Sequence, residues 1–375
     1  YTYNILDAAS ISDLEDIDAK TNITTYNITG GISDSSENIF SENSVKAAVT
    51  TLVGRDLDVG ITITGTLNTT QVNNVLAITN YTGNLTANLS GSNSDLNSLN
   101  STTADTINIT VTDGVSIANI TTLESKTSGT LTFSSGIADT LANLAPSGTV
   151  NSNISNDVTV TVSGTLSTAT NVTHLDAVRA ATTGSVTATL NGTLAVLKEL
   201  DAGADALAIT ISDTLSPASA QNVTDINTVK ASTGGVVTIA SINGTAAVLD
   251  DLDTDTSDEL TITVNDTATV AQGKAIVNAT SATTVDFSAG GVTDDLSNLR
   301  DGSAIHADLT AIKNKDSDII VTVNTVTVTA AAEVSAINSI ASSLSGSNRL
   351  QGSVTGTLAL LDDLNAHGSV VNLDL

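Results

Sequence analysis

The sequence predicts an α/β fold, a repeat solenoid in which parallel β-strands alternate with short helices. The first observation is a strand–helix unit that recurs about every 25 residues, as in GSVTATLNGTLAVLKELDAGAD from Gly184. The second is another version of the unit, DVTVTVSGTLSTATNVTHLDAVRAAT from Asp157, which alternates with the first to give a double repeat of about 50 residues. The third is an apolar content made almost entirely of Val, Ile, Leu and Ala. Such uniform side chains suit thin layers, each buried against its neighbours.

Strict alternation of Thr with Ile or Val marks the expected strands. The clearest cases are Ile61–Thr64, Thr159–Val162, Thr261–Val264 and Thr325–Val328. Because successive side chains of a strand point to opposite faces, this pattern buries the aliphatic residues on one face and leaves hydroxyls on the other. The two ends, Tyr1–Ile5 and Val370–Leu375, also read as strands, which we expect to pair with neighbouring copies or with adjoining repeats.

A Gly followed by Thr is expected to end many strands. The glycines concerned are Gly65, Gly164, Gly192, Gly244 and Gly356. We expect the Gly to adopt a backbone conformation that is closed to most residues. The Thr is expected to cap the first turn of the next helix.

The expected helices carry two aliphatic residues three positions apart, which places both on one helical face. One series is Leu96/Leu99, Leu141/Leu144, Leu197/Leu200, Leu249/Leu252, Leu296/Leu299 and Leu361/Leu364. The other is Leu14/Ile17, Ile120/Leu123, Leu175/Val178, Ile226/Val229 and Ile337/Ile340. The longest spacings predict loop insertions near Ile305–Ser317 and Ser343–Leu350.

No composition shift divides the chain into unlike domains. Residues 1–60 are the most divergent part, and residues 61–375 read as a continuous array. The expected double repeats cover about 61–108, 109–156, 157–206, 207–259, 260–318 and 319–375.

Charge and composition exclude several classes of protein. With 40 acidic and 12 basic residues, the formal net charge of −28 repels phosphate backbones and excludes sequence-independent binding of nucleic acid. No apolar run reaches the length of a membrane span, so we expect no membrane insertion. The absence of Cys excludes disulfides and thiolate metal sites. A surface of Thr, Ser and Asn favours a secreted protein at an extracellular or cell-surface location.

The sequence offers little for catalysis. The histidines His174, His306 and His367 share no spacing, and no phosphate loop, nucleophile elbow or zinc motif is present. The seven Tyr and Phe residues are too few to line the sugar groove of a carbohydrate-active enzyme. We therefore expect a non-enzymatic protein without a cofactor, with calcium as the one alternative.

The calcium hypothesis rests on Asp251, Asp253, Asp255 and Asp258, which lie in one acidic loop. Alternating carboxylates are typical of calcium loops, but the Gly of a helix–loop–helix site is missing. A solvated acidic loop between helix and strand is the other interpretation. Glycosylation is a separate hypothesis, because about 16 Asn-x-Ser/Thr sequons occur. Candidate sites include Asn22, Asn84, Asn108, Asn191 and Asn278.

The Gly-Thr-Leu turns, Leu-x-x-Leu helices and Thr/Val strands, in an acidic chain without Cys, resemble long repetitive extracellular proteins of marine bacteria such as cyanobacteria. This resemblance implies a surface fibre, an S-layer-like coat or an adhesin, and it transfers no functional residue. We expect a subunit or segment of an extracellular filament or cell-surface coat, assembled by end-to-end and lateral stacking of solenoids. Its partners would be copies of itself or adjoining repeats. The alternative is a stalk or binding segment of a giant adhesin that contacts surface glycans.

Overall fold

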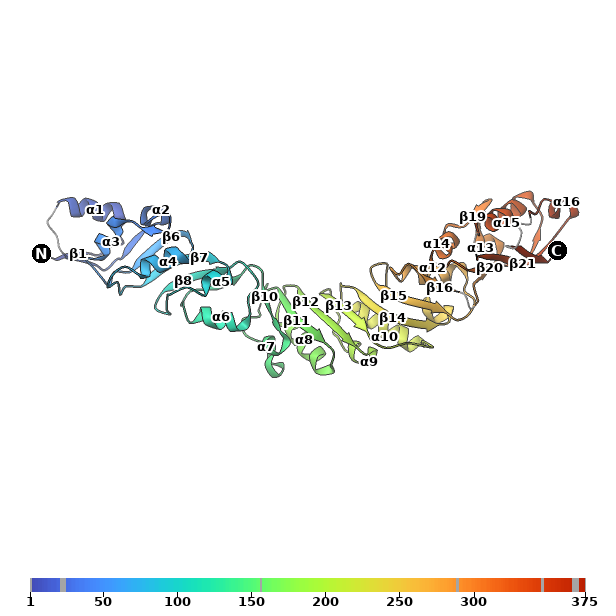
Figure 1. Ribbon diagram of the computed structural model, residues 1–375, viewed down its shortest axis with the longest axis horizontal. Coiled ribbons are helices and arrows are strands. Elements are labelled where there is room, and N and C mark those ends of the chain that lie inside the picture. Colours follow the sequence, from blue (N-terminus) through green and yellow to red (C-terminus); the bar gives the residue numbers. More distant parts are fainter. Residues whose placement is uncertain are drawn as a thin grey trace. The chain divides into compact units, whose positions relative to one another are not determined.

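Parallel strands and short helices alternate along the chain in the computed structural model (Figure 1). The structure describes residues 2–20, 25–155, 157–287, 290–344, 347–365 and 371–374, the last of these as backbone only. Contacts divide the chain into unit 1, Tyr1–Ser163 with Ala177–Ser185, and unit 2, Gly164–Asp176 with Val186–Leu375. The predicted α/β fold with mostly parallel strands is confirmed.

Unit 1 contains the elements from β1 to η1. They are β1 (Thr2–Ile5), α1 (Ile11–Lys20), β2 (Thr25–Ile28), β3 (Ile32–Ser35), α2 (Ser36–Ile39), β4 (Phe40–Ser41), β5 (Ser44–Val45), α3 (Ala47–Val53), β6 (Ile61–Leu67), α4 (Thr69–Leu76), β7 (Leu85–Gly91), α5 (Asn93–Leu96), β8 (Thr106–Val111), α6 (Ile117–Glu124), β9 (Leu131–Phe133), β10 (Ile137–Thr140), α7 (Leu141–Leu144) and the 3₁₀ helix η1 (Pro146–Gly148). The division between the units runs through β11 (Val160–Leu166) and α8 (Ala169–Ala181).

Unit 2 contains the elements from β12 onward. They are β12 (Val186–Gly192), α9 (Leu194–Leu197), β13 (Ala206–Ile211), α10 (Ala220–Ala231), β14 (Val237–Gly244), α11 (Ala246–Leu249), β15 (Glu259–Val264), α12 (Val270–Asn278), β16 (Val285–Asp286), β17 (Val292–Asp294), α13 (Leu296–Leu299), β18 (Arg300–Asp301), β19 (Ala304–Ile305), α14 (Ala307–Lys315), β20 (Ile320–Val328), α15 (Ala331–Ser343), β21 (Arg349–Gly356), α16 (Leu358–Leu361) and β22 (Val371–Asp374).

Within each unit, strands pair in parallel with the next strand of the same sheet along the chain. In unit 1 the main sheet has the order β3-β6-β7-β8-β9, while β1 pairs with β2 and β10 with β11. In unit 2 the strands follow one another as β12-β13-β14-β15-β16 and as β17-β20-β21-β22. The hairpins β4–β5 and β18–β19 are antiparallel. No sheet formed by the described residues closes into a barrel.

The two faces of these strands differ as the Thr alternation predicts. In β7 and β8, Leu89 pairs with Ile109, and both side chains are 1% exposed. Their neighbours Asn88 and Asn108 are exposed, and the Asn108 side-chain amide donates to Asn88 Oδ1 at 3.1 Å. The sheet therefore has an aliphatic face that packs into the core and a hydroxyl- and amide-bearing face that meets solvent.

The predicted role of the turn glycines holds at two of the five positions. Gly65 and Gly164 have positive φ (95° and 86°), and in β6 the pairing with β7 shifts register around Gly65. Gly192, Gly244 and Gly356 do not have positive φ, so the prediction was wrong for them. A Cβ on Gly356 would come within 2.6 Å of Val328 Cγ2 and one on Gly244 within 3.3 Å of the Leu249 side chain, whereas Gly192 has no such close neighbour among the described residues.

The predicted capping by Thr is also wrong at the single-turn helices. Thr193, Thr245 and Thr357 hold the N-cap positions of α9, α11 and α16, yet none of their side chains makes a cap hydrogen bond. Aspartates from the following segment take this role. Leu194 N–H donates to Asp213 Oδ2 (2.6 Å), and Ala246 N–H donates to Asp266 Oδ1 (2.7 Å). The first turn of α9 and of α11 is therefore held by a residue about 20 positions later.

The aliphatic pairs form the core of the helical layer. Ile120/Leu123, Leu175/Val178 and Ile226/Val229 are all 0% exposed. Ile17, Leu361 and Leu364 are the half-buried members. The predicted loop insertion near Ile305–Ser317 was wrong, because β19 and α14 occupy this stretch. Leu309 and Ile312, again three residues apart, are buried and give α14 its apolar face.

Two kinds of polar side chain, all buried except the half-buried Asp205, hold the N-terminal ends of strands. Asp105, Asp205 and Asp258 accept from the first residues of β7, β12 and β14 (Leu85, Val186 and Val237) at 2.9, 2.8 and 2.8 Å. Thr127, Thr233 and Thr280 accept from Ile107, Leu207 and Leu260 of β8, β13 and β15 at 2.8, 3.0 and 2.9 Å. We call these residues the Asp brackets and the Thr brackets. Successive strands use the two kinds alternately.

Candidate functional site

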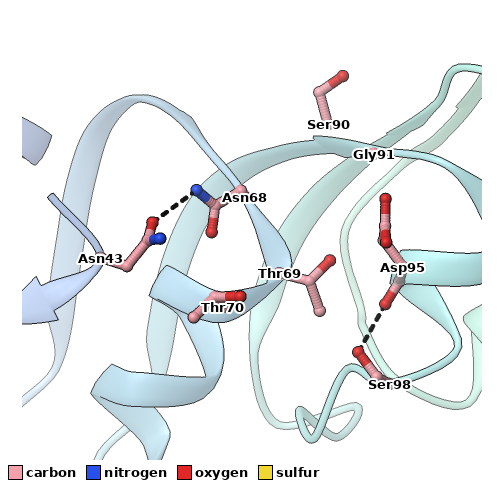
Figure 2. A pocket seen from close by; sticks show the side chains of 8 residues that line it. All are labelled: Asn43, Asn68, Thr69, Thr70, Ser90, Gly91, Asp95 and Ser98. Carbon is pink, nitrogen blue, oxygen red and sulfur yellow. Dashed lines mark hydrogen bonds between the residues drawn. The ribbon is translucent and has the colours of Figure 1, made fainter.

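A polar hollow of about 270 Å³ lies in unit 1, where β6 and β7 lead into α4 and α5. Figure 2 shows the residues that line it: Asn43, Asn68, Thr69, Thr70, Ser90, Gly91, Asp95 and Ser98. They bring hydroxyl, amide and carboxylate groups together without an aromatic side chain.

Hydrogen bonds fix the geometry of this hollow. The Asn68 side-chain amide donates to Asn43 Oδ1 at 2.9 Å, and Asn68 Oδ1 accepts from Gln71 N–H in a capping box at the start of α4. Ser98 Oγ donates to the Asp95 carbonyl at 2.7 Å. Thr69 is 6% exposed, and its Oγ1 has no partner within the described part of the chain. The hollow can offer hydrogen bonds to a hydroxylated ligand, but Asp95 is the single titratable side chain in its lining.

The four aspartates of the calcium hypothesis do not converge on one point. Asp258 is 0% exposed and is an Asp bracket, and its carboxylate also pairs with Lys230 Nζ (2.8 Å) and accepts from Asp255 N–H (2.9 Å). Asp255 Oδ1 accepts from Ser257 N–H (2.7 Å), and Asp251 and Asp253 are exposed. Protein donors therefore occupy the carboxylate of Asp258. Calcium binding at this loop stays a prediction.

Charge arrangement around Lys230 explains how a carboxylate can be buried here. Burial alone would lower the pKa of Lys230, but hydrogen bonds and the charges of Asp258 and Asp255 raise it above its usual value. Hydrogen bonds from Ser257 lower the pKa of Asp255. Lys230 is thus held as a cation against two anions, which is the arrangement of a structural ion pair.

The two histidines within the described residues belong to different helices. His174 lies in α8 and His306 caps α14, where its Nδ1 accepts from Asp308 N–H at 3.2 Å; His367 lies outside the described residues. No group of three or more His, Cys, Asp or Glu side chains suited to a metal occurs in the residues that the structure describes. Within the same residues, no helix is long and apolar enough to cross a membrane.

Four of the five sequon residues named above are on the surface. Asn84, Asn108, Asn191 and Asn278 are exposed, and Asn22 lies outside the described residues. Asn108 is already engaged, because its Oδ1 accepts from Thr130 N–H and Oγ1 at 3.1 and 3.0 Å. Glycosylation of these residues stays a prediction, with Asn108 the least available of them.

Sequence reasoning missed three strand junctions, at which one strand ends and another starts after a short turn. They are β2/β3, β9/β10 and β16/β17, and the turns contain Gly31, Gly136 and Gly291, all with positive φ. The signal in the sequence was Gly-Ile/Val-x-Asp followed by Asn four residues after the Asp. Each Asp accepts from this Asn and from the first N–H of an earlier helix, as Asp34 does from Asn38 (2.7 Å) and Ile11 (2.9 Å).

Among the described residues, β1 pairs with β2 along one edge and with no strand along the other. Thr29 N–H donates to the Ile5 carbonyl at 2.9 Å, so the backbone N–H and C=O groups of Ile5 and Tyr3 point toward β2. Those of Asn4 point to the other side. Tyr3 is 42% exposed, while its cross-strand neighbour Tyr26 is 4% exposed. The aliphatic and aromatic face of β1 is therefore only partly covered.

No protein-family model, curated protein or solved structure matches this chain.

Proposed function

We propose that this chain is a non-enzymatic structural protein, a solenoid that forms a subunit or segment of an extracellular filament or cell-surface coat. The observation that carries the proposal is the system of brackets. Each bracketed strand has the N–H of its first or second residue held by a side chain that lies 19 to 26 residues later, so one layer is completed by the next. A fold built this way is extended by adding layers rather than by enlarging one core.

Two surfaces support stacking of such layers. The edge of β1 that no described strand pairs with, together with the half-exposed Tyr3, suits end-to-end contact. Exposed amides and hydroxyls suit lateral contact, because they already bond to one another across strands, as Asn27 does to Asn4 (3.0 Å) and Thr327 to Thr355 (2.9 Å). Both kinds of contact would use chemistry that the fold already uses internally.

Electron microscopy of the purified chain, together with sedimentation over a wide range of concentration, tests this function. We expect filaments or sheets to grow with concentration. Asn4→Pro should shorten or abolish them, because it removes the N–H that faces away from β2 while the pairing through Ile5 stays intact. Asn4→Ala is the matched control, since it keeps the backbone edge and loses only the bond from Asn27. Monodisperse monomers of the unaltered chain at high concentration would contradict the proposal.

The polar hollow favours a second function, a stalk or binding segment of a giant adhesin that contacts glycans. Its amide and hydroxyl lining suits hydrogen bonding to a sugar. Further copies of the unit on both sides in the reading frame would support this alternative. A glycan array probed with the chain and with Asn68→Ala would test it, and equal binding by both would exclude the hollow as the site.

A further inference from the structure

A second hollow, of about 390 Å³, lies in unit 1 beside β9, at the middle one of the three strand junctions along the chain. Its lining comprises Leu131, Thr132, Phe133, Ser152, Asn153, Ser155, Asp157 and Val158. The apolar side chains Leu131 and Phe133 are only half-buried there. The hollow therefore combines an incompletely covered strand with polar groups on the opposite wall.

The equivalent strands at the other two junctions are fully covered. In β2, Tyr26 and Ile28 are 4% and 3% exposed, and beside β16 Phe287 is 0% exposed. In both places a buried aspartate lies against the strand: Ile28 N–H donates to Asp56 Oδ2 (2.6 Å), and Phe287 N–H donates to Asp316 Oδ2 (2.8 Å). At these two junctions an aspartate of the chain itself therefore occupies the space beside the strand.

The strand register identifies why the middle junction is different. Ile61, Val160 and Val321 pair with equivalent residues of β3, β10 and β17. Counting back the same number of residues from each leads to Asp56, Ser155 and Asp316. The middle junction thus has a serine where the others have the aspartate, and the serine brings no carboxylate to the strand.

Two backbone donors face the hollow as a result. β9 bonds to β8 through Ile109 N–H to the Thr130 carbonyl (2.8 Å) and Ser134 N–H to the Val111 carbonyl (3.0 Å), so the N–H groups of Leu131 and Phe133 point to the other side. Neither has a hydrogen-bond partner among the described residues. The N–H equivalent to that of Leu131 at the first junction, on Tyr26, donates to the Arg55 carbonyl at 3.2 Å.

We propose that this hollow binds an extended acidic peptide segment of another protein. A carboxylate of the segment accepts from Phe133 N–H, as Asp56 does at Ile28, and a peptide carbonyl accepts from Leu131 N–H, as Arg55 does at Tyr26. Alternate residues of a strand are about 6.6 Å apart, so two acceptors along an extended chain fit better than one small carboxylate. An apolar side chain of the segment covers Leu131 and Phe133.

Salt is expected to strengthen this binding. The net charge of −28 repels an acidic segment, and Asp157 lies in the wall of the hollow, with its Oδ1 bonded to Thr183 Oγ1 at 2.9 Å. Screening weakens such repulsion between exposed charges more than it weakens short hydrogen bonds in a hollow. The affinity should therefore rise between low and moderate salt, which is the reverse of an ordinary charge-driven interaction.

The probe for the test is the segment that fills the first junction, residues 53–59 of this chain (Val-Gly-Arg-Asp-Leu-Asp-Val), made as a capped, fluorescein-labelled peptide. Fluorescence anisotropy with the full chain should show saturable binding. The same peptide with Ala in place of the Asp that corresponds to Asp56 should bind at least about fivefold more weakly, because the acceptor for Phe133 N–H is lost.

Ser155→Asp is the decisive variant, because it restores the aspartate of the other junctions. It should abolish peptide binding and raise the thermal stability of the chain, whereas Thr103→Asp, on an exposed turn of the same unit, adds the same charge and should leave binding unchanged. Leu131→Pro should weaken binding at least about fivefold, since it removes a donor that β8 does not use. Failure of the unaltered chain to bind the peptide at any salt concentration, or equal binding by Ser155→Asp, would overturn the proposal.

Discussion

The Asp brackets and the Thr brackets perform the same task in alternate strands with opposite electrostatics. Asp105 accepts from Leu85 N–H and, through its other oxygen, from Thr102 N–H. Thr233 accepts from Leu207 N–H and donates its own proton to the Leu207 carbonyl at 2.8 Å. The hydroxyl balances a donor against an acceptor within one neutral group, whereas the carboxylate buries a charge that the surroundings must stabilise.

This difference between the two kinds of bracket indicates where the fold needs a basic side chain. Asp258 is the most buried of the Asp brackets, and its carboxylate pairs with Lys230. Other basic side chains bond to carbonyl groups of neighbouring segments, as Lys46 does to the Glu37 carbonyl at 2.6 Å and Lys313 to the Ser343 carbonyl at 3.2 Å. With 12 basic residues against 40 acidic ones, most carboxylates cannot have a basic partner, whereas the buried carboxylate of Asp258 has Lys230.

The largest effect is expected when a charged bracket loses its cation. Lys230→Met should lower the free energy of unfolding of unit 2 by about 3–5 kcal/mol, because Asp258 then remains buried without a counterion. Urea unfolding followed by circular dichroism measures this. Lys274→Met is the matched control: Lys274 and Asp308 form a pair 3.7 Å apart with side chains that are 34% and 38% exposed, so it should cost less than about 1 kcal/mol. Equal effects of the two variants would contradict the distinction.

Removing a charged bracket altogether should have the next largest effect. Asp105→Ala leaves Leu85 N–H and Thr102 N–H without their acceptor. Because Asp105 is only 5% exposed, we expect the free energy of unfolding to fall by about 2–3 kcal/mol. Hydrogen exchange should show faster exchange of the Leu85 amide before other amides of β7 are affected. Unchanged protection of Leu85 would mean that the bracket does not hold the start of the strand.

A neutral bracket should be less costly to remove. Thr233→Val keeps the shape of the side chain and loses every hydrogen bond of the hydroxyl, including those from Leu207 N–H and Gly235 N–H. We expect the free energy of unfolding to fall by about 1–2 kcal/mol. Thr233→Ser is the control, because it keeps the hydroxyl and should recover most of the stability. If Thr233→Val is as damaging as Asp105→Ala, the brackets do not differ in the way that their charges indicate.

The brackets also mark the limit of what the sequence could predict. The alternation of Thr with Ile or Val and the aliphatic pairs are local signals, so strands such as β6 and helices such as α10 were predictable from short windows. Asp258 belongs to an acidic loop, and its neighbours suggest a calcium ligand. What no local pattern reveals is that Val237 and Lys230, 21 and 28 residues upstream, donate to it.

The smallest effect concerns Asp56 and Asp316, which accept hydrogen bonds at the first and third strand junctions. Each lies beside a second carboxyl group. Burial, followed by the proximity of Asp58 and Asp318 respectively, raises the pKa of Asp56 and of Asp316 above the usual value. A carboxyl group with a raised pKa in the folded state favours folding at acid pH, and this contribution is lost as the pH rises through the raised value. The free energy of unfolding should therefore fall as the pH rises from the usual pKa of an aspartate to the raised value.

Asp58→Asn removes the neighbouring carboxyl group and should flatten this part of the pH profile of unit 1, measured as urea midpoints from about pH 4 to pH 7. Asp7→Asn removes one exposed negative charge of the same unit and controls for the change in net charge. Ser155 makes the comparison sharper, because the middle junction has no buried carboxyl group to titrate. Ser155→Asp should introduce at that junction the same fall of the urea midpoint with rising pH. If the midpoints of Ser155→Asp instead ran parallel to those of the unaltered chain, the position of the aspartate, rather than its burial, would decide how it titrates.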